Sequence, residues 1–390
     1  MQAPGRRTIL TVSCIGMLTV CFATAAPAMC LTAIARELGR TKLAMGLFLS
    51  SAFWGFVPAI LATGPLADRI GFRALLVFGA LLQAAGLAGV SLAGSLPWLL
   101  AGGALVGAGT GVTDALLTPI VCAVYPERRS AITALLHGFY PVGVAATVGL
   151  ILLLTGLGAS WRGVYRVLAV LPLPYAVGMA AIGLPRQAHA GTARLPARRL
   201  LRRGAFLGLL AAIFLGAVTE ITPTGWLPAF VEEATHGSPT AGGLGLLLFA
   251  AAMMLGRFGA SAAQRRFGTR AVFAASAAIC AASLLAAAVP APTAVTIVAL
   301  SVLGLGVAVF WPMICGAAGD RYPQAGASMF SLVAAAGNFG GVVGPAVMGA
   351  VAEWAGLRVA MGILAVAPIA VGLLMVRLAP PKPGRPAVTE

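Results

Sequence analysis

Twelve long apolar segments, separated by shorter polar ones, make up most of the chain. A helix needs about 20 apolar residues to cross roughly 30 Å of hydrocarbon. Gly and Pro inside the segments are tolerated where neighbouring helices satisfy the freed backbone groups. The pattern lacks the short alternating strands of a barrel, so it predicts an all-α polytopic membrane protein. The spans are expected at residues 8–33, 43–65, 73–94, 97–121, 131–157, 162–184, 204–230, 240–262, 271–290, 293–316, 325–352 and 357–378.

Composition supports a lipid environment. Of the 390 residues, 60% are hydrophobic and 9% are charged, whereas an average soluble domain has about 25% charged residues. The first segment follows Arg6 and Arg7 and also resembles a secretory signal. Its apolar run continues to about Ala35, so we predict a first membrane span, with a cleaved signal as the alternative.

The basic residues give the orientation. The chain has 26 Lys and Arg against 10 Asp and Glu. With a cytoplasmic N-terminus, nineteen basic residues lie in cytoplasmic segments, six lie in outer ones, and Arg257 lies within a span. This bias follows the positive-inside rule and predicts two cytoplasmic termini in a bacterial-type cell inner membrane. It also explains the net charge of +16 without a nucleic-acid partner.

The chain divides into two related halves. Residues 185–203 are polar and basic and predict a cytoplasmic linker, with four arginines suited to anionic lipid headgroups. Six-helix bundles are expected at 1–184 and 204–378, followed by a cytoplasmic tail at 379–390. A Gly and an Arg recur after spans two and eight at an offset of 197 residues. Duplicated halves are typical of secondary transporters, which bind substrate between the repeats.

The loop after span two carries a family signature. The run Gly64-Pro65-Leu66-Ala67-Asp68-Arg69-Ile70-Gly71-Phe72-Arg73 resembles the signature of the major facilitator superfamily, although a basic residue is usual where Phe72 stands. The resemblance implies twelve helices in two pseudo-symmetric six-helix bundles and a conformational gate that latches the cytoplasmic side. The gate residues that it implies, with their second-half counterparts, are Gly64, Asp68, Arg69, Gly71, Arg73, Arg265, Gly268 and Arg270.

A narrower resemblance concerns span four. Asp114 stands five positions before Pro119, as in the branch that includes the fucose–proton symporters. The segments Trp226-Leu227-Pro228 and Phe310-Trp311-Pro312 are also similar to that branch. The resemblance implies proton coupling at Asp114 and a sugar substrate. Span one departs from the branch, because it has no carboxylate.

Ionisable side chains inside spans are functional candidates. A bilayer disfavours an ionised carboxylate, so Asp114 and Glu220 are candidates for carrying a proton. We place Glu220 in the outer half of the bilayer and expect Pro223 to break its helix. His137 titrates near neutrality and could relay a proton. A structural hydrogen bond for Asp114 or His137, and a position near the water interface for Glu220, are the alternatives.

Five further side chains are candidates for substrate binding. Aromatic rings could stack on a solute, although interfacial anchoring is the rival role for tryptophans. Arg257 is explained either by snorkelling to the headgroups or by a salt bridge in a cytoplasmic gate. The substrate candidates are Tyr140, Trp54, Trp226, Trp311 and Asn338.

Other kinds of function have no signal in the sequence. There is no Walker loop, metal cluster or nucleophile–base set, so neither an enzyme activity nor a cofactor is expected. We predict proton-coupled uptake of a small polar solute, such as a sugar, by a monomer that works by alternating access. Span five lacks the Gly-Pro element of drug–proton antiporters, which argues against the main alternative, a drug or metabolite exporter. The third alternative is a non-transporting membrane sensor or scaffold.

Overall fold

The computed structural model describes residues 5–182 and 197–378. Twelve helical segments in this part of the chain are long and apolar enough to cross a membrane, which confirms the predicted polytopic helical fold. Most of the expected linker, residues 185–196, lies outside the described residues, as does the expected tail at 379–390.

The first half contains six spans. Spans one and six each consist of two consecutive helices, which meet at Cys21 and Leu171. A short 3₁₀ helix, η1 (Pro126–Arg128), precedes the fifth span. The helices are α1 (Arg6–Val20), α2 (Phe22–Leu38), α3 (Lys42–Ile70), α4 (Phe72–Ser91), α5 (Leu96–Val124), α6 (Arg129–Gly156), α7 (Trp161–Val170) and α8 (Pro172–Ala181).

The second half repeats this plan after the short helix α9 (Ala197–Leu201). Its fourth and sixth spans, ten and twelve, are pairs of helices, whereas its first span is a single helix; η2 (Pro323–Ala325) stands where η1 stands in the first half. The helices are α10 (Gly204–Ala234), α11 (Pro239–Phe267), α12 (Thr269–Ala288), α13 (Thr293–Val307), α14 (Phe310–Arg321), α15 (Gly326–Ala355), α16 (Leu357–Leu364) and α17 (Val366–Leu378).

One expected helix break is wrong. Pro223 lies inside α10, which continues to Ala234. A membrane helix tolerates an internal proline when side chains and neighbouring helices accommodate the local change. The hydroxyl of Thr224 donates a hydrogen bond to the carbonyl of Glu220 at 2.5 Å, within the same helix.

The two halves share the geometry of their turns. Gly71 joins α3 to α4 with φ 84° and ψ 156°, and Gly268 joins α11 to α12 with φ 84° and ψ 158°. Each glycine N–H donates a 2.9 Å hydrogen bond to the carbonyl four residues earlier. Only glycine adopts this backbone conformation readily. The offset of 197 residues therefore reflects a structural repeat.

A second repeated feature lies where the sixth span of each half begins. Arg162 donates to the carboxylate of Glu37 and to the carbonyl of Ser91, both at 2.9 Å. In the second half, Arg358 donates to the carbonyls of Ala234 and Val289 at 2.7 and 2.8 Å. Each arginine thus ties together the ends of the first and third spans of its half.

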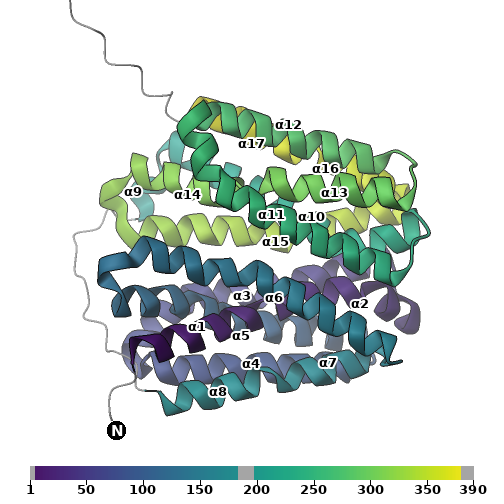
Figure 1. Cartoon of the computed structure of the whole chain (residues 1–390), viewed down its shortest axis with the longest axis horizontal. Helices are drawn as coiled ribbons and strands as arrows, with labels where there is room; N and C mark the ends of the chain where they lie inside the picture. The colour runs from purple at the N-terminus through teal and green to yellow at the C-terminus, as the bar shows by residue number, and fades with distance from the viewer. Residues whose placement is uncertain (1–4, 183–196, 379–390) are drawn as a thin grey trace, which may run out of the picture.

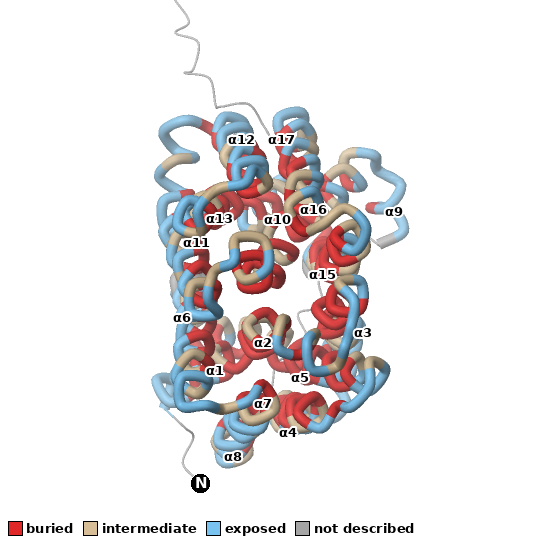
Figure 2. Tube along the Cα trace, turned by 90° about the vertical axis from the view of Figure 1, so that its right-hand side faces the viewer, coloured by how far each residue is buried: buried red, intermediate tan, exposed pale blue. Residues whose placement is uncertain are grey.

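The halves lie side by side, with α1–α8 on one side and α10–α17 on the other (Figure 1). The end that carries the turns at 71 and 268 also carries the start of α1 and the end of α17, and we name it the basic end. Figure 2 looks along the helices from the opposite end, with buried residues inside and exposed ones around the outside. Many of the exposed residues are large and apolar, which suits contact with lipid.

The end opposite the basic end is closed by direct contact between the halves. A Cβ on Gly46 of α3 would meet the carbonyl oxygen of Pro345 in α15, and one on Gly349 would lie 2.5 Å from the carbonyl oxygen of Lys42. The carboxylate of Glu353 accepts hydrogen bonds from the backbone N–H groups of Lys42 and Leu43 at 2.7 and 3.3 Å. These contacts define what we name the sealed end.

Candidate functional site

A cavity of about 210 Å³ lies between the two halves. Helices α1, α2, α3, α5 and α6 line it from the first half, and α10, α11, α14 and α15 line it from the second. Its apolar walls include Met17, Phe53 and Phe56. Its polar lining residues are Thr24, Thr110, Asp114, His137, Tyr140, Glu220, Arg257 and Asn338.

Asp114 and His137 face the same part of this cavity. His137 interacts electrostatically with Asp114 and with Arg257. Its Nε2 lies 3.1 Å from the hydroxyl of Thr118, one turn after Asp114 on α5. Glycines on α5 allow it to pack closely against α3, because a Cβ on Gly111 would lie 2.7 Å from the carbonyl oxygen of Phe56. The cavity thus brings a carboxylate and an imidazole together inside the membrane.

Glu220 and Arg257 form an ion pair across the second half. The Nη2 of Arg257 donates to the Oε1 of Glu220 at 3.3 Å, and the side chains are 30% and 18% exposed. Glu220 is the seventeenth of 31 residues in α10, and Arg257 is the nineteenth of 29 in α11. Both therefore lie near the middle of their helices.

This arrangement corrects one expectation for Arg257. Arg257 does not snorkel to the inner interface, because its guanidinium points into the cavity and pairs with an acid. Counting residues from the span end misplaced Arg257, because α11 continues to Phe267, beyond the expected end of its span at residue 262. Glu220 lines the same cavity as the seventeenth of 31 residues in α10, and its place in the outer half of the bilayer stays a prediction.

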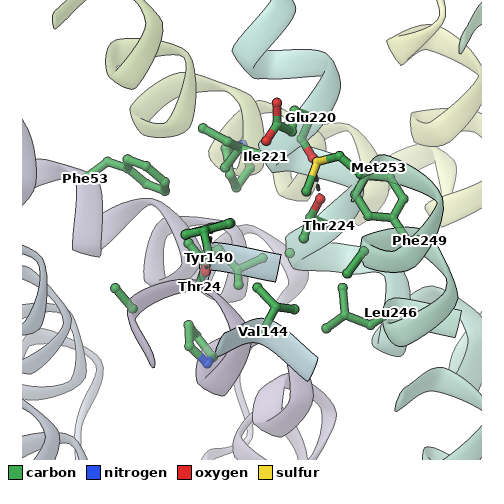
Figure 3. Close-up of a pocket in the computed structure, with 16 residues that line it drawn as sticks. Thr24, Phe53, Tyr140, Val144, Glu220, Ile221, Thr224, Leu246, Phe249 and Met253 are labelled. Carbon is green, nitrogen blue, oxygen red and sulfur yellow. Dashed lines mark hydrogen bonds between the residues drawn. The ribbon is translucent and has the colours of Figure 1, made fainter. Parts of the chain in front are cut away.

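The cavity continues toward the sealed end as a narrower pocket. Figure 3 shows Glu220 and Thr224 of α10 across this pocket from Tyr140 and Thr24 of the first half. The Tyr140 hydroxyl lies 3.2 Å from the hydroxyl of Thr24. Apolar residues such as Phe249 close the far side. A solute in the cavity would therefore meet hydroxyl groups first and an apolar wall beyond them.

The other substrate candidates divide into two groups. Trp311 and Asn338 line the cavity, and the amide nitrogen of Asn338 donates to the carbonyl of Ala334 at 2.9 Å. Trp226 is buried at 1% exposure near the sealed end, and its Nε1 donates to the carbonyl of Pro345 at 3.2 Å. Trp54 is 38% exposed and does not line this cavity.

The expected gate residues lie at the basic end, away from the cavity. They flank the two repeated turns, where α3 meets α4 and α11 meets α12. The charged members are exposed. The residues in this position are Gly64, Asp68, Arg69, Gly71, Arg73, Arg265, Gly268 and Arg270.

Sequence reasoning missed several residues of the site and the seal. Phe53 and Thr24 line both the cavity and the narrower pocket, yet a phenylalanine or a threonine in an apolar run carries no distinctive signal. At the sealed end, Lys42 lies 3.5 Å from Glu233 of the other half. The acids that flank the spans, Glu233 and Glu353, were a usable signal. Among the described residues, no three His, Cys, Asp or Glu side chains gather as they would around a metal ion.

Comparison with protein families identifies the chain. The model of the Major Facilitator Superfamily matches residues 10–236 and 223–390. The chain belongs to the major facilitator superfamily. The two pseudo-symmetric halves and the cavity between them agree with this membership. The superfamily members that the chain matches are transporters and not enzymes.

Superfamily relatives match over part of their length. An uncharacterized MFS-type transporter of Mycobacterium tuberculosis is 32% identical over 36% of this chain and 35% of its own. The 3-(3-hydroxy-phenyl)propionate transporter of Escherichia coli is 29% identical over 36% of this chain and 34% of its own. The matched region therefore spans about a third of the length of these curated relatives.

Solved superfamily structures match over the whole fold. A mutant form of the nucleoside transporter NupG has a TM-score of 0.80 at 15% identity, and the match covers 96% of this chain and all of that one. A variant of the Escherichia coli fucose:proton symporter FucP has a TM-score of 0.65 at 19% identity, and the match covers 97% of this chain and all of that one. At these identities, the likeness concerns the fold alone.

Proposed function

We propose that this chain is a secondary active transporter that couples proton movement to the uptake of a small polar solute by alternating access. One observation carries the proposal: four ionisable side chains from four helices, Asp114, His137, Glu220 and Arg257, meet in a cavity between the two halves. Burying such groups in a membrane is costly. They mark a pathway for protons or solute when they face an internal cavity.

The closed end supports alternating access. The halves contact each other at the sealed end through Gly46, Gly349 and Glu353, whereas the polar lining extends to His137, the ninth residue of α6 from the basic end. If the basic end is cytoplasmic, as the charge bias predicts, this conformation is closed to the outside. A rocking motion of the halves would then open the sealed end. We place the protein in a bacterial-type cell inner membrane as a monomer.

Asp114 is the proposed proton carrier, with Glu220 and His137 as further coupling groups. Asp114 lies in the cavity within electrostatic reach of His137. Burial disfavours a lone negative charge, so proton binding and release would accompany the change between the two open states. The resemblance to proton symporters in span four supports the same residue.

The size of the cavity bears on the class of solute. Its volume of about 210 Å³ is smaller than the roughly 300–1,000 Å³ typical of sites for drug-sized ligands, which favours a small solute over a bulky drug. By their names, three of the matched proteins transport an aromatic acid, a nucleoside and fucose. These solutes differ in class, so the sugar expected from the resemblance in span four stays a prediction. Tyr140, Trp311 and Asn338 are the proposed contacts of the solute.

The Asp114→Asn variant tests the coupling. The amide cannot carry a proton, so we expect loss of accumulation driven by a pH gradient in proteoliposomes, while counterflow exchange of solute continues. The matched control is Asp320→Asn, an exposed acid at the end of α14, which should leave both activities unchanged. Accumulation against a gradient by Asp114→Asn would contradict the assignment.

The rival functions differ in what they transport and in which direction. An exporter would move solute out of the cell, so transport in right-side-out and inverted vesicles separates it from an uptake system. A sensor or scaffold would show no solute flux, and its function would survive Asp114→Asn unchanged.

A further inference from the structure

Arg257 is an unusual residue for the middle of a membrane helix. A guanidinium stays charged at any accessible pH and offers five N–H donors. Its side chain lies in the wall of the central cavity, at the nineteenth of 29 residues of α11. A charge at this depth costs free energy. The Arg257 guanidinium therefore needs a binding partner that supplies negative charge or hydrogen-bond acceptors.

The partner within the chain satisfies Arg257 only in part. Glu220 accepts one hydrogen bond from Nη2 at 3.3 Å, which is longer than the roughly 2.7–2.9 Å of a good charge-assisted bond. The Nε of Arg257 is buried and has no hydrogen-bond partner among the described residues. The Nε and Nη2 side of a guanidinium is the fork that binds both oxygens of a carboxylate. Here that fork is only half used.

The groups around Arg257 leave room for a second anion. Glu220 of α10 faces it as an ion-pair partner, and His137 and Tyr140 of α6 interact with it electrostatically. Asp114 of α5 lines the same cavity, where it faces His137. If protons occupied Asp114 and Glu220, the cavity would keep one uncompensated positive charge, which favours an anionic solute over a neutral or cationic one.

The rest of the cavity wall selects for the body of the solute. Phe53 and Phe56 of α3 and Trp311 of α14 supply aromatic surfaces in the cavity that Arg257 lines. Aromatic rings favour a flat or apolar group packed against them. The cavity thus combines a receptor for a negatively charged head with an apolar wall.

Resting on the proposed function, we propose that the transported solute is a small organic monocarboxylate with an apolar or aromatic body, and that the Arg257 guanidinium receives its carboxylate. The solute carboxylate engages Nε and the adjacent Nη2, in competition with Glu220. Arg257 is then a substrate-binding residue. The proton-carrying acids balance the charge that the solute brings.

The experiment measures binding by the full-length protein in detergent micelles, where no gradient is present. Titration calorimetry compares benzoate with benzamide, which has the same shape without the charge, and also tests benzylamine and L-fucose. We expect benzoate to bind at least about tenfold more tightly than benzamide, the ratio typical of a hydrogen-bonded charge pair. Benzylamine and L-fucose should bind more weakly than benzoate.

Variants locate the effect at the guanidinium. Arg257→Gln should bring the benzoate-to-benzamide ratio close to one. Arg257→Lys keeps the charge but loses the planar fork, so the ratio should fall to an intermediate value. This second variant keeps the test valid if Arg257→Gln does not fold. The matched control is Arg166→Gln, which changes an exposed arginine on α7 and should keep the wild-type ratio.

The inference is overturned if the wild-type protein binds no benzoate, or if it binds benzamide, benzylamine or L-fucose as tightly as benzoate. It is also overturned if the Arg257→Gln variant keeps the wild-type preference for benzoate over benzamide. The proposed function fails separately, if proteoliposomes show no solute flux under a pH gradient. Benzoate binding without flux would therefore support the carboxylate site and contradict the transport proposal.

Discussion

The backbone conformation of Gly71 constrains which residue can stand at this position. Its φ of 84° and ψ of 156° fall in a region that is essentially restricted to glycine, and other residues there are strained by about 1–3 kcal/mol. No atom lies within 4 Å of a Cβ added at this position. Any effect of a substitution therefore arises from the backbone and not from a clash.

We accordingly predict that Gly71→Ala lowers the midpoint of thermal unfolding in detergent, because alanine would be strained in this backbone conformation. Gly268→Ala should behave alike, since its dihedral angles are nearly the same. Gly149→Ala is the control, because that glycine lies inside α6 with open space around it, and alanine favours a helix by about 1 kcal/mol. Equal midpoints for Gly71→Ala and Gly149→Ala would contradict the strain argument.

Apart from threonines such as Thr24, the polar residues of the cavity were predictable one by one, but their partners were not. A polar side chain in a lipid-facing segment has to turn inward, which is why Asp114, His137, Tyr140 and Asn338 all line the cavity. Tryptophan occurs in cavities, in packed cores and at interfaces. Sequence alone could not separate Trp311 from the buried and exposed tryptophans.

At the level of elements, the crossing of α3 and α15 closes the sealed end. Gly46 and Gly349 bring the two backbones into direct contact, and their Cα atoms lie close enough that a Cβ on either would meet the other helix. The carboxylate of Glu353 accepts from the first backbone N–H groups of α3, where the helix dipole favours an anion. The seal thus needs small residues and one well-placed acid.

Gly46→Val should hold the sealed end apart, because the added side chain would overlap the carbonyl of Pro345. Spin labels at positions 95 and 292, which lie in loops of opposite halves at this end, report the separation by double electron–electron resonance in a background without the native cysteines. We expect the distances to lengthen relative to the unsubstituted protein. Gly149→Val is the control, and an unchanged distribution in Gly46→Val would contradict this account of closure.

The elements themselves were largely readable from sequence, and their interruptions were not. Hydropathy placed all twelve spans because lipid requires long apolar helices. Pro223 was expected to break a helix that in fact continues, whereas the first span is interrupted at Cys21, where no proline or glycine stands. Such interruptions depend on packing between helices, which a single segment does not encode.

For the whole molecule, the charge bias makes the strongest prediction. The turns and chain ends at the basic end carry most of the arginines, and such segments remain in the cytoplasm. Trypsin, which cleaves after arginine and lysine, should therefore cut within 194–203 in inverted membrane vesicles and leave that stretch intact in right-side-out vesicles. Immunoblots against tags on the two halves would reveal the fragments. Cleavage within this stretch in right-side-out vesicles would contradict the predicted orientation.

The repeated turns have a consequence for how such a chain could arise. Each half contains six spans, an even number, so both halves enter and leave the membrane on the same side. A single ancestral six-helix gene could thus have produced a working homodimer whose subunits were inserted the same way up, related by an axis along the membrane normal. Fusing two such copies needed only a connecting peptide and no inversion.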